Sequence, residues 1–220
     1  MKKIIYLTFF IVISILTSCS LQPFEDTSDE SGTDIEHTAI EEDSSLFTQG
    51  SNESQFIFET NDLKYQKEKG YTLWCTKYKN TGEKFEPFCT TVSKESGKSE
   101  CGFGVVFLQQ KTDETDFLMT VMINTKGQFI IGSVSDGKFT TIKNWQECPY
   151  LLKGNGIKNK IEAYQKEETI FVLKLNDYEV CDFTIPKNIL IKESQNGYVT
   201  VIAQNENFPN TPVRTVFENK

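Results

Sequence analysis

Residues 116–143 read DFLMTVMINTKGQFIIGSVSDGKFTTIK, and this stretch decides the fold. Apolar side chains recur at every second position along much of it, as at Val121 and Ile123. This period places one face of a strand toward a core and the other toward water. Two turn signals divide the stretch: NTKG at 124–127, and DG at 136–137, a pair typical of a tight hairpin. The stretch therefore predicts three successive antiparallel strands.

The same pattern extends over residues 55–220, where short apolar runs alternate with turn signals. No segment shows a helical repeat sustained over several turns. The expected strands cover residues 55–59, 70–78, 85–93, 102–110, 116–123, 127–134, 137–143, 158–165, 168–175, 178–184, 197–204 and 212–218. About a dozen closely spaced strands indicate an all-β antiparallel sandwich or barrel rather than a parallel sheet with crossover helices.

The N-terminus has the form of a bacterial export signal. Two lysines precede a mostly apolar run, residues 4–16, which is shorter than the roughly 20 residues that a membrane-spanning helix needs. We therefore expect residues 1–18 to be a signal peptide that is removed. The tetrapeptide LTSC that ends at Cys19 resembles the lipobox of bacterial lipoproteins. The resemblance implies that Cys19 carries acyl chains such as palmitate, which anchor the protein to a cell membrane of the envelope. An ordinary signal peptide with a chance cysteine is the alternative.

Residues 19–54 are rich in Ser, Thr, Asp and Glu and contain no Lys or Arg. Such a segment buries too little apolar surface to offset the entropy of ordering the chain. We expect a disordered acidic tether that like charges extend away from an anionic membrane. A calcium-binding arm is disfavoured because no EF-hand spacing is present.

Charge and histidine content exclude several functions. The net charge of −8 and the pI of about 4.9 argue against nucleic acid as a partner. The acidic excess lies in the tether, so residues 55–220 are formally neutral. His37 is the only histidine and also lies in the tether, which disfavours His-based metal sites, catalytic triads and Cys-His dyads. We expect no cofactor and no metal.

A series of motifs carries a resemblance to a known fold. The motifs are Gly102-Phe-Gly104-Val-Val-Phe107, Phe117-Leu-Met-Thr-Val-Met-Ile123, Gly127-Gln-Phe129-Ile-Ile-Gly132, Asp136-Gly137-Lys138, Trp145, Asn159-Lys-Ile161, Asn176, Gly197-Tyr-Val199 and Arg214-Thr-Val-Phe217-Glu-Asn219. In this order they resemble concanavalin A-like jelly rolls, and most of all the laminin G-like and 3-keto-disaccharide-hydrolase-type domains of bacterial exported proteins. The resemblance implies a two-sheet jelly-roll sandwich over residues 55–220. Asp177 stands where these domains commonly have Gly, and Asp can still adopt the left-handed conformation of that turn.

Catalytic residues are not evident. Some concanavalin A-like relatives are glycoside hydrolases with Glu-x-Asp-x-x-Glu on one strand. The local match is Glu114-Thr-Asp116, but Met119 replaces the third acid. Retaining hydrolysis needs two carboxyl groups about 5 to 5.5 Å apart. We therefore assign no catalytic residue, and a different carboxylate pair brought together by folding stays open.

Two aromatic residues are candidates for ligand binding. Trp145 and Tyr150 flank Cys148 after the hairpin at 136–137, and aromatic rings on loops hold sugars through the apolar C–H face of a pyranose. For Trp145, packing against the sheet is the favoured alternative, and Trp74 is expected in the core.

Five cysteines remain besides Cys19, and an exported protein meets an oxidising compartment. Cys89 and Cys101 are a candidate disulfide if residues 85–93 and 101–107 form a hairpin. Cys148 and Cys181 are a second candidate. The spacings lack the Cys-x-x-Cys pairs of zinc ribbons, so no structural metal is expected.

Three functions remain open at this point. The first is a non-catalytic, lipid-anchored envelope protein that binds a glycan or a protein. The second is a sugar-active hydrolase of the 3-keto-disaccharide hydrolase type, which predicts carboxylates converging on one sheet face. The third is a structural or assembly lipoprotein that offers an apolar contact surface.

Overall fold

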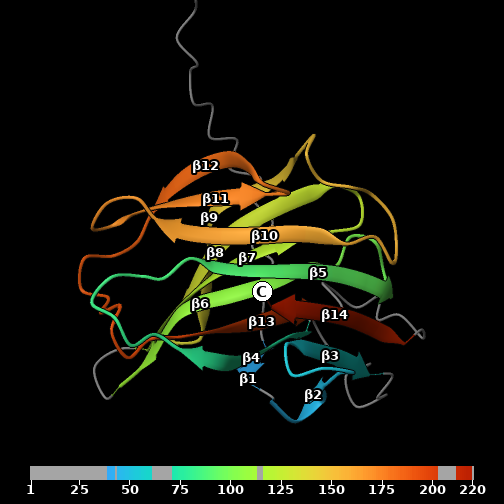
Figure 1. Cartoon of the computed structure of the whole chain (residues 1–220), viewed down its shortest axis with the longest axis horizontal. Helices are drawn as coiled ribbons and strands as arrows, with labels where there is room; N and C mark the ends of the chain where they lie inside the picture. Colours follow the sequence, from blue (N-terminus) through green and yellow to red (C-terminus); the bar gives the residue numbers. More distant parts are fainter. Residues whose placement is uncertain (1–38, 43, 61–70, 113–115, 203–211, 220) are drawn as a thin grey trace, which may run out of the picture. The chain divides into compact units, whose positions relative to one another are not determined.

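The computed structural model describes residues 39–42, 44–60, 71–112, 116–202 and 212–219. They form two β-sheets packed face to face, with β10 and β5 crossing in front of β7 and β6 in Figure 1. Within these ranges no helix has the length and apolar character needed to cross a membrane. The expected signal peptide, Cys19, His37 and most of the tether lie outside the described residues.

Each sheet has seven strands. Sheet A has the order β1-β4-β13-β6-β7-β8-β9 and sheet B the order β12-β11-β10-β5-β14-β3-β2. The strands are β1 (Ala39–Glu42), β2 (Phe47–Gln49), β3 (Gln55–Thr60), β4 (Tyr71–Lys79), β5 (Phe88–Ser96), β6 (Phe103–Lys111), β7 (Asp116–Ile123), β8 (Gln128–Ser135), β9 (Lys138–Glu147), β10 (Asn159–Gln165), β11 (Ile170–Leu175), β12 (Tyr178–Thr184), β13 (Gln195–Val201) and β14 (Val213–Asn219). All described neighbours pair antiparallel except β1, which runs parallel to β4. The predicted antiparallel sandwich is confirmed, and every predicted strand is present as β3 to β14.

The domain begins earlier than predicted. Residues placed in the tether form β1, a 3-10 turn at Ser44–Leu46, and β2. Phe47 is 3% exposed, and its ring centroid lies 5.1 Å from that of Phe58. The boundary at residue 55 was therefore wrong. A polar window hid Leu46 and Phe47, which pack against the core once β2 pairs with the neighbouring β3.

The predicted hairpin turns are confirmed by their backbone angles. Asp136 and Gly137 have φ of 51° and 73°, and Asn176 and Asp177 have φ of 49° and 72°. Two consecutive left-handed residues match the right-handed twist of the flanking strands. Asp177 thus does what Gly does in the resembling domains.

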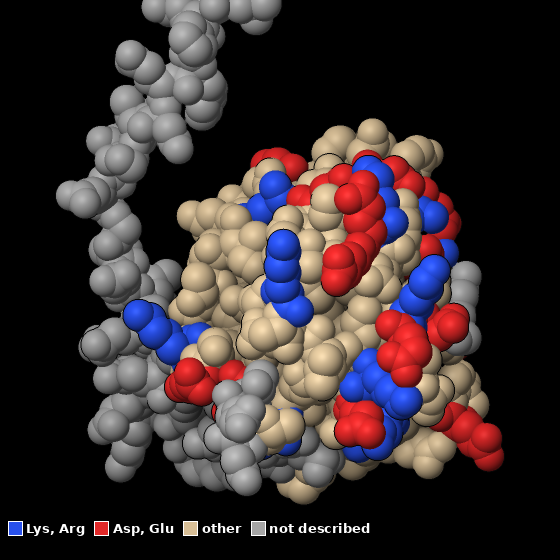
Figure 2. Space-filling view, turned by 90° about the vertical axis from the view of Figure 1, so that its left-hand side faces the viewer, with Lys and Arg blue, Asp and Glu red and all other residues tan. Residues whose placement is uncertain are grey.

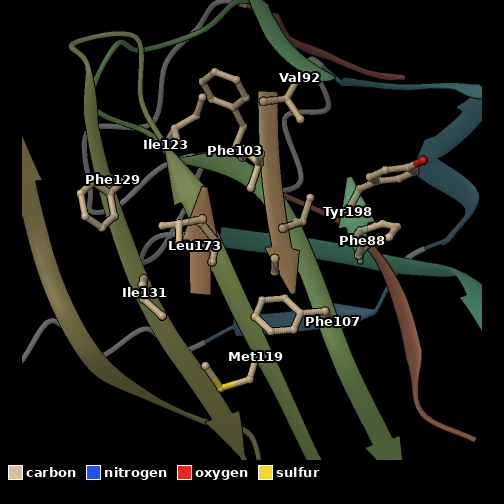
Figure 3. Close-up of a cluster of buried hydrophobic side chains, with 14 of the residues drawn as sticks. Phe88, Val92, Phe103, Phe107, Met119, Ile123, Phe129, Ile131, Leu173 and Tyr198 are labelled. Atoms are coloured by element: carbon tan, nitrogen blue, oxygen red, sulfur yellow. The ribbon is translucent and has the colours of Figure 1, made fainter. Parts of the chain in front are cut away.

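The core lies between the sheets and is rich in aromatic rings. Figure 3 shows side chains of sheet A, such as Phe103, Phe107 and Met119, facing Phe88 and Leu173 of sheet B. Such ring contacts add about 1 kcal/mol each beyond the burial of area.

One phenol group of this core needs a hydrogen-bond partner. Tyr198 is fully buried, and its hydroxyl lies 2.9 Å from that of Tyr78. Burial, together with this hydrogen bond, raises the pKa of Tyr198 far above its ordinary value. The pair places a satisfied polar contact inside an apolar layer.

A second apolar layer covers the outer face of sheet A, and we call it the outer-face cluster. It contains Trp74, Cys101, Val106, Leu118, Met122, Ile130, Val134, Val199 and Val201. The alternation predicted that one face of these strands meets water. The structure instead buries the central strands β6 and β7 on both faces. Trp74 is buried, as expected, but in this cluster. Thr120 lies among these residues, and its Oγ1 has no hydrogen-bond partner.

The outer face of sheet B is different and carries charged pairs. Glu162 lies 3.3 Å from Lys160 and 3.6 Å from Lys174, and the Tyr164 hydroxyl donates to Glu179 at 2.7 Å. This face meets water, as the alternation of β10 and β11 predicts.

Candidate functional site

The first predicted disulfide is excluded by the strand order. Cys89 lies on β5 and Cys101 directly before β6, but β5 pairs with β10 and β14, while β6 pairs with β13 and β7. Cys89 is in register with Glu162, one residue from the core positions Phe88 and Thr90, so it faces outward from sheet B. Cys101 belongs to the outer-face cluster of sheet A. The expected hairpin was wrong because β5 and β6 belong to different sheets, and the two thiols lie on opposite outer faces with the sandwich between them.

The second pair behaves differently. Cys148 is buried and Cys181 is half-buried, and both pack into the same core cluster, although both are thiols in the structure. Burial raises the pKa of the Cys181 thiol, which makes it a weaker nucleophile at neutral pH. A disulfide between them stays a prediction.

Trp145 packs against the sheet. Its ring lies about where a side chain on Gly102 would be, with Cη2 3.1 Å from an ideal Cβ at that position. It is half-buried against the outer-face cluster. The packing alternative is therefore the one that the structure favours, and Trp145 does not offer a free ring face beside Tyr150.

Tyr150 is exposed and has a partner that sequence reasoning missed. Its ring lies parallel to that of Tyr178, with centroids 4.2 Å apart and an interplanar angle of 7°. Tyr150 is 41% exposed and Tyr178 is 56% exposed. We call this pair the tyrosine stack. The outer faces of its two rings point away from each other and offer an aromatic surface to a ligand.

Two asparagines hold the stack in place. Asn176, in the turn before Tyr178, donates from Nδ2 to the Tyr150 carbonyl at 2.7 Å and to Oδ1 of Asn159 at 2.8 Å. Asn159 is 3% exposed and bonds both the N–H and the carbonyl of Leu152. The loop that carries Tyr150 is therefore fixed to the β11–β12 hairpin. Tyr178 was detectable only as an aromatic residue beside a predicted turn, since its partner is 28 positions away.

Charged groups lie next to the stack. Asp177 hydrogen-bonds Lys160, and this bond raises the pKa of the lysine above its ordinary value. Glu162 and Lys174 continue the row along the outer face of sheet B. An aromatic surface beside fixed polar groups is an arrangement that can hold the C–H face of a sugar and hydrogen-bond its hydroxyls.

A groove lies at the opposite end of the sandwich. Because β10 runs from Asn159 to Gln165, the stack and the groove are about 20 Å apart. The groove has a volume of about 550 Å³, and one of its walls is the loop from Ile185 to Glu193. We call it the Leu190 groove. No aromatic side chain of the described residues lines it.

Among the described residues, the acids do not reproduce the Glu-x-Asp-x-x-Glu pattern of the glycoside hydrolases. Glu114 lies outside the described residues, Asp116 begins β7, and Met119 is buried in the core. In the Leu190 groove, Glu83, Glu168 and Glu193 are all exposed, and Glu83 forms an ion pair of 3.0 Å with Lys192. Among the described residues no cluster of three His, Cys, Asp or Glu side chains is placed to hold a metal ion. The exposed carboxylates lack the apolar pocket that prepares an acid catalyst.

Comparison with solved structures bears on the fold. A beta-glucanase of Bacillus licheniformis is 5% identical in sequence, with a TM-score of 0.50 over 80% of this chain and 81% of its own. A native glycosidic hydrolase is 9% identical, with a TM-score of 0.50 over 81% of this chain and 82% of its own. The chain has a concanavalin A-like jelly-roll fold. A carbohydrate-binding module of family 66 from Bacillus subtilis has a TM-score of 0.44 at 10% identity, over 79% of this chain and 88% of its own. No protein-family model and no curated protein sequence matches the chain.

Proposed function

We propose that this jelly roll is a non-catalytic glycan-binding domain, held at the surface of a bacterial envelope by a lipid on Cys19. The observation that carries the proposal is the exposed tyrosine stack. The parallel aromatic pair stays 41% and 56% exposed, and apolar area of this kind contributes about 25 cal/mol per Å² when a ligand covers it.

The surroundings of the stack favour a sugar over an apolar ligand. Asp177 and Lys160 offer an acceptor and a donor beside the rings. A pyranose has one C–H face and a rim of hydroxyls, which matches a flat ring with polar neighbours. The fold supports the same class, because the Bacillus licheniformis protein of similar architecture is named for a glucan.

Binding is favoured over hydrolysis by the placement of the acids. On sheet B, Glu162 and Glu179 are engaged by Lys160, Lys174 and Tyr164. A glycosidase needs two carboxyl groups that are free to face the sugar, and these carboxylates are already held in ion pairs and a hydrogen bond.

The anchor accounts for the acidic segment. A lipid at Cys19 followed by an acidic tether places the folded domain at a distance from the anionic headgroups, where it meets glycans of the envelope or of a host. Metabolic labelling with a palmitate analogue tests this part. Label on the wild type that the Cys19→Ala variant lacks supports it, and equal labelling of both overturns it.

A glycan array with the full-length protein in detergent tests the binding. We expect binding to at least one glycan, and a loss of about tenfold in affinity for Tyr178→Ala, which removes the more exposed ring. Leu190→Ala is the matched control, because Leu190 is equally accessible and lies at the other end. An array without hits, or equal losses for both variants, contradicts the assignment.

A further inference from the structure

The loop that forms one wall of the Leu190 groove holds an apolar side chain out in water. Leu190 is 67% exposed, the highest value among the large hydrophobic residues of the described structure. Its backbone is nevertheless fixed. The Gln110 side chain, which is 9% exposed, donates from Nε2 to the Leu190 carbonyl at 3.0 Å and accepts from its N–H at 3.3 Å. A buried amide is thus used to position an exposed leucine.

The other end of this loop is fixed by a buried polar network. Asn80 donates from Nδ2 to Ser194 Oγ at 2.8 Å and exchanges hydrogen bonds with the amide of Asn196. The Asn80 carbonyl accepts from the N–H of Glu193 at 3.0 Å, and Asn196 Oδ1 accepts from the N–H of Leu108 at 3.2 Å. Satisfied buried networks of this kind hold one conformation.

Backbone strain is concentrated in the same place. Five non-glycine residues of the described chain have positive φ, and three of them lie in the tight hairpin turns. The remaining two are Leu108 at 55° and Glu193 at 74°, and both bond to the network around Asn80 and Asn196. Leu108 lies at a bulge of β6, and Glu193 lies in the turn from Ile191 to Ser194. Left-handed non-glycine residues cost about 1 kcal/mol or more and persist where the surrounding structure enforces them, which is common at binding sites.

The chemistry of the walls indicates the ligand. The loop contributes the exposed side chain of Leu190, with Ile185 and Ile189 at 4% and 7% exposure beneath it, and Gln165 and Glu168 also line the groove. Glu83 and Lys192 in the lining form an ion pair with each other. The other charged side chains of the lining are two acids, Glu168 and Glu193, and one base, Lys187, which leaves a small net negative charge. Figure 2, which views this end, shows acidic and basic side chains interleaved. Aliphatic contacts beside a slight acidic excess match an aliphatic side chain next to a cationic one.

We propose that the Leu190 groove is a second, independent binding site that accepts an extended polypeptide segment with an aliphatic residue beside a lysine or arginine. Aromatic rings are absent from its lining, which disfavours a sugar. Its volume of about 550 Å³ lies in the range of ligand sites and accommodates a few side chains. Because Gln110 and Asn80 fix the loop in advance, little conformational entropy is lost when the segment binds.

Fluorescence polarisation with the full-length protein tests this site. The probe is a fluorescein-labelled peptide of about eight residues, long enough to cross the groove when extended, in which leucine and arginine alternate. We expect saturable binding at an ionic strength of about 0.15 M, and a loss of about tenfold for Leu190→Ser. Leu152→Ser is the matched control, since this leucine is 57% exposed and lies beside the tyrosine stack. Glu168→Lys should also weaken binding, whereas Glu147→Lys on β9 should not.

Two comparison peptides define the outcomes. A peptide of alternating leucine and glutamate and one of alternating serine and arginine should both bind more weakly than the probe. If the serine–arginine peptide binds as tightly as the probe, the surface is electrostatic without an aliphatic pocket, and the proposal is overturned. Equal probe affinities of the Leu190→Ser and Leu152→Ser variants also overturn it. Tyr178→Ala should leave the peptide affinity unchanged, so this test and the glycan test fail separately.

Discussion

The two ends of the sandwich present different surfaces built on similar supports. At one end, Asn159 and Asn176 hold two exposed tyrosines in a stack. At the other, Asn80 and Asn196 support a strained loop with an exposed leucine. Buried asparagines fix a loop in both places, but the exposed side chains are aromatic in one and aliphatic in the other. The comparison teaches that the sandwich serves as a rigid frame, and that chemistry is set by a few loop residues.

The largest expected effect is at the groove end. Asn196→Leu leaves the Asn80 amide and the Leu108 N–H without their buried partner, so we expect a loss of about 4 kcal/mol in the free energy of unfolding. Urea denaturation measures it. Asn159→Leu provides the corresponding change at the tyrosine end, where Leu152 is closer to water. If Asn196→Leu lowers the free energy of unfolding by less than Asn159→Leu does, the buried asparagines at the groove end contribute less to stability than those at the tyrosine end, contrary to this prediction.

A pH effect distinguishes the tyrosine end. Lys94 lies at the end of β5, where its carbonyl accepts from the N–H of Gly156 in the loop that follows Tyr150. Its ammonium donates to the carbonyls of Lys98 and Cys101 at 2.7 and 2.9 Å. Burial lowers the pKa of Lys94 from 10.5 to about 8, partly offset by Cys101 and Glu100.

The sign of this effect follows from proton binding. Between pH 8 and 10.5 the unfolded chain keeps the proton that the folded chain has released, so stability rises with pH across this window, by on the order of 3 kcal/mol. Below pH 8 both states are protonated and the dependence vanishes. Thermal unfolding across this range checks the slope, with Lys94→Met as the variant that should abolish it. An unchanged slope in that variant assigns the pH dependence to another group.

The smallest effect separates stability from binding in the stack itself. Asn176→Gly keeps the left-handed turn but removes the bonds to Tyr150 and Asn159, so we expect about 1 kcal/mol less stability and several-fold weaker glycan binding. Asp136→Gly is the control, because it makes the same kind of change in the equivalent β8–β9 hairpin turn without touching the stack. Microscale binding assays and thermal melts on both variants give the result. Glycan affinities that fall equally would show that a general loss of stability, and not the Asn176 amide, explains the effect.

Local patterns predicted the strands but not their neighbours. Residues 116–143 yielded β7, β8 and β9 because alternation and turn pairs act within a few residues. The proposed pairing of Cys89 with Cys101 failed because consecutive strands β5 and β6 enter different sheets. Phe47 was missed for a related reason, since it also packs against the ring of Phe217, which is distant in the chain.

The candidate sites show the same division. Tyr150 was predicted from its type and its place in a loop, whereas Tyr178 joined it only through the β11–β12 hairpin. Nothing local marks Gln110 or Asn80 as supports for a loop more than 70 residues away. For residues 55–220 the amino-acid sequence by itself determined the strand content, the tight turns and the formal neutrality, because propensity, turn geometry and charge are properties of short segments. Only the tertiary structure decided which sheet each strand joins, which tyrosines stack and where strain is stored, because these depend on contacts between residues that the chain holds far apart.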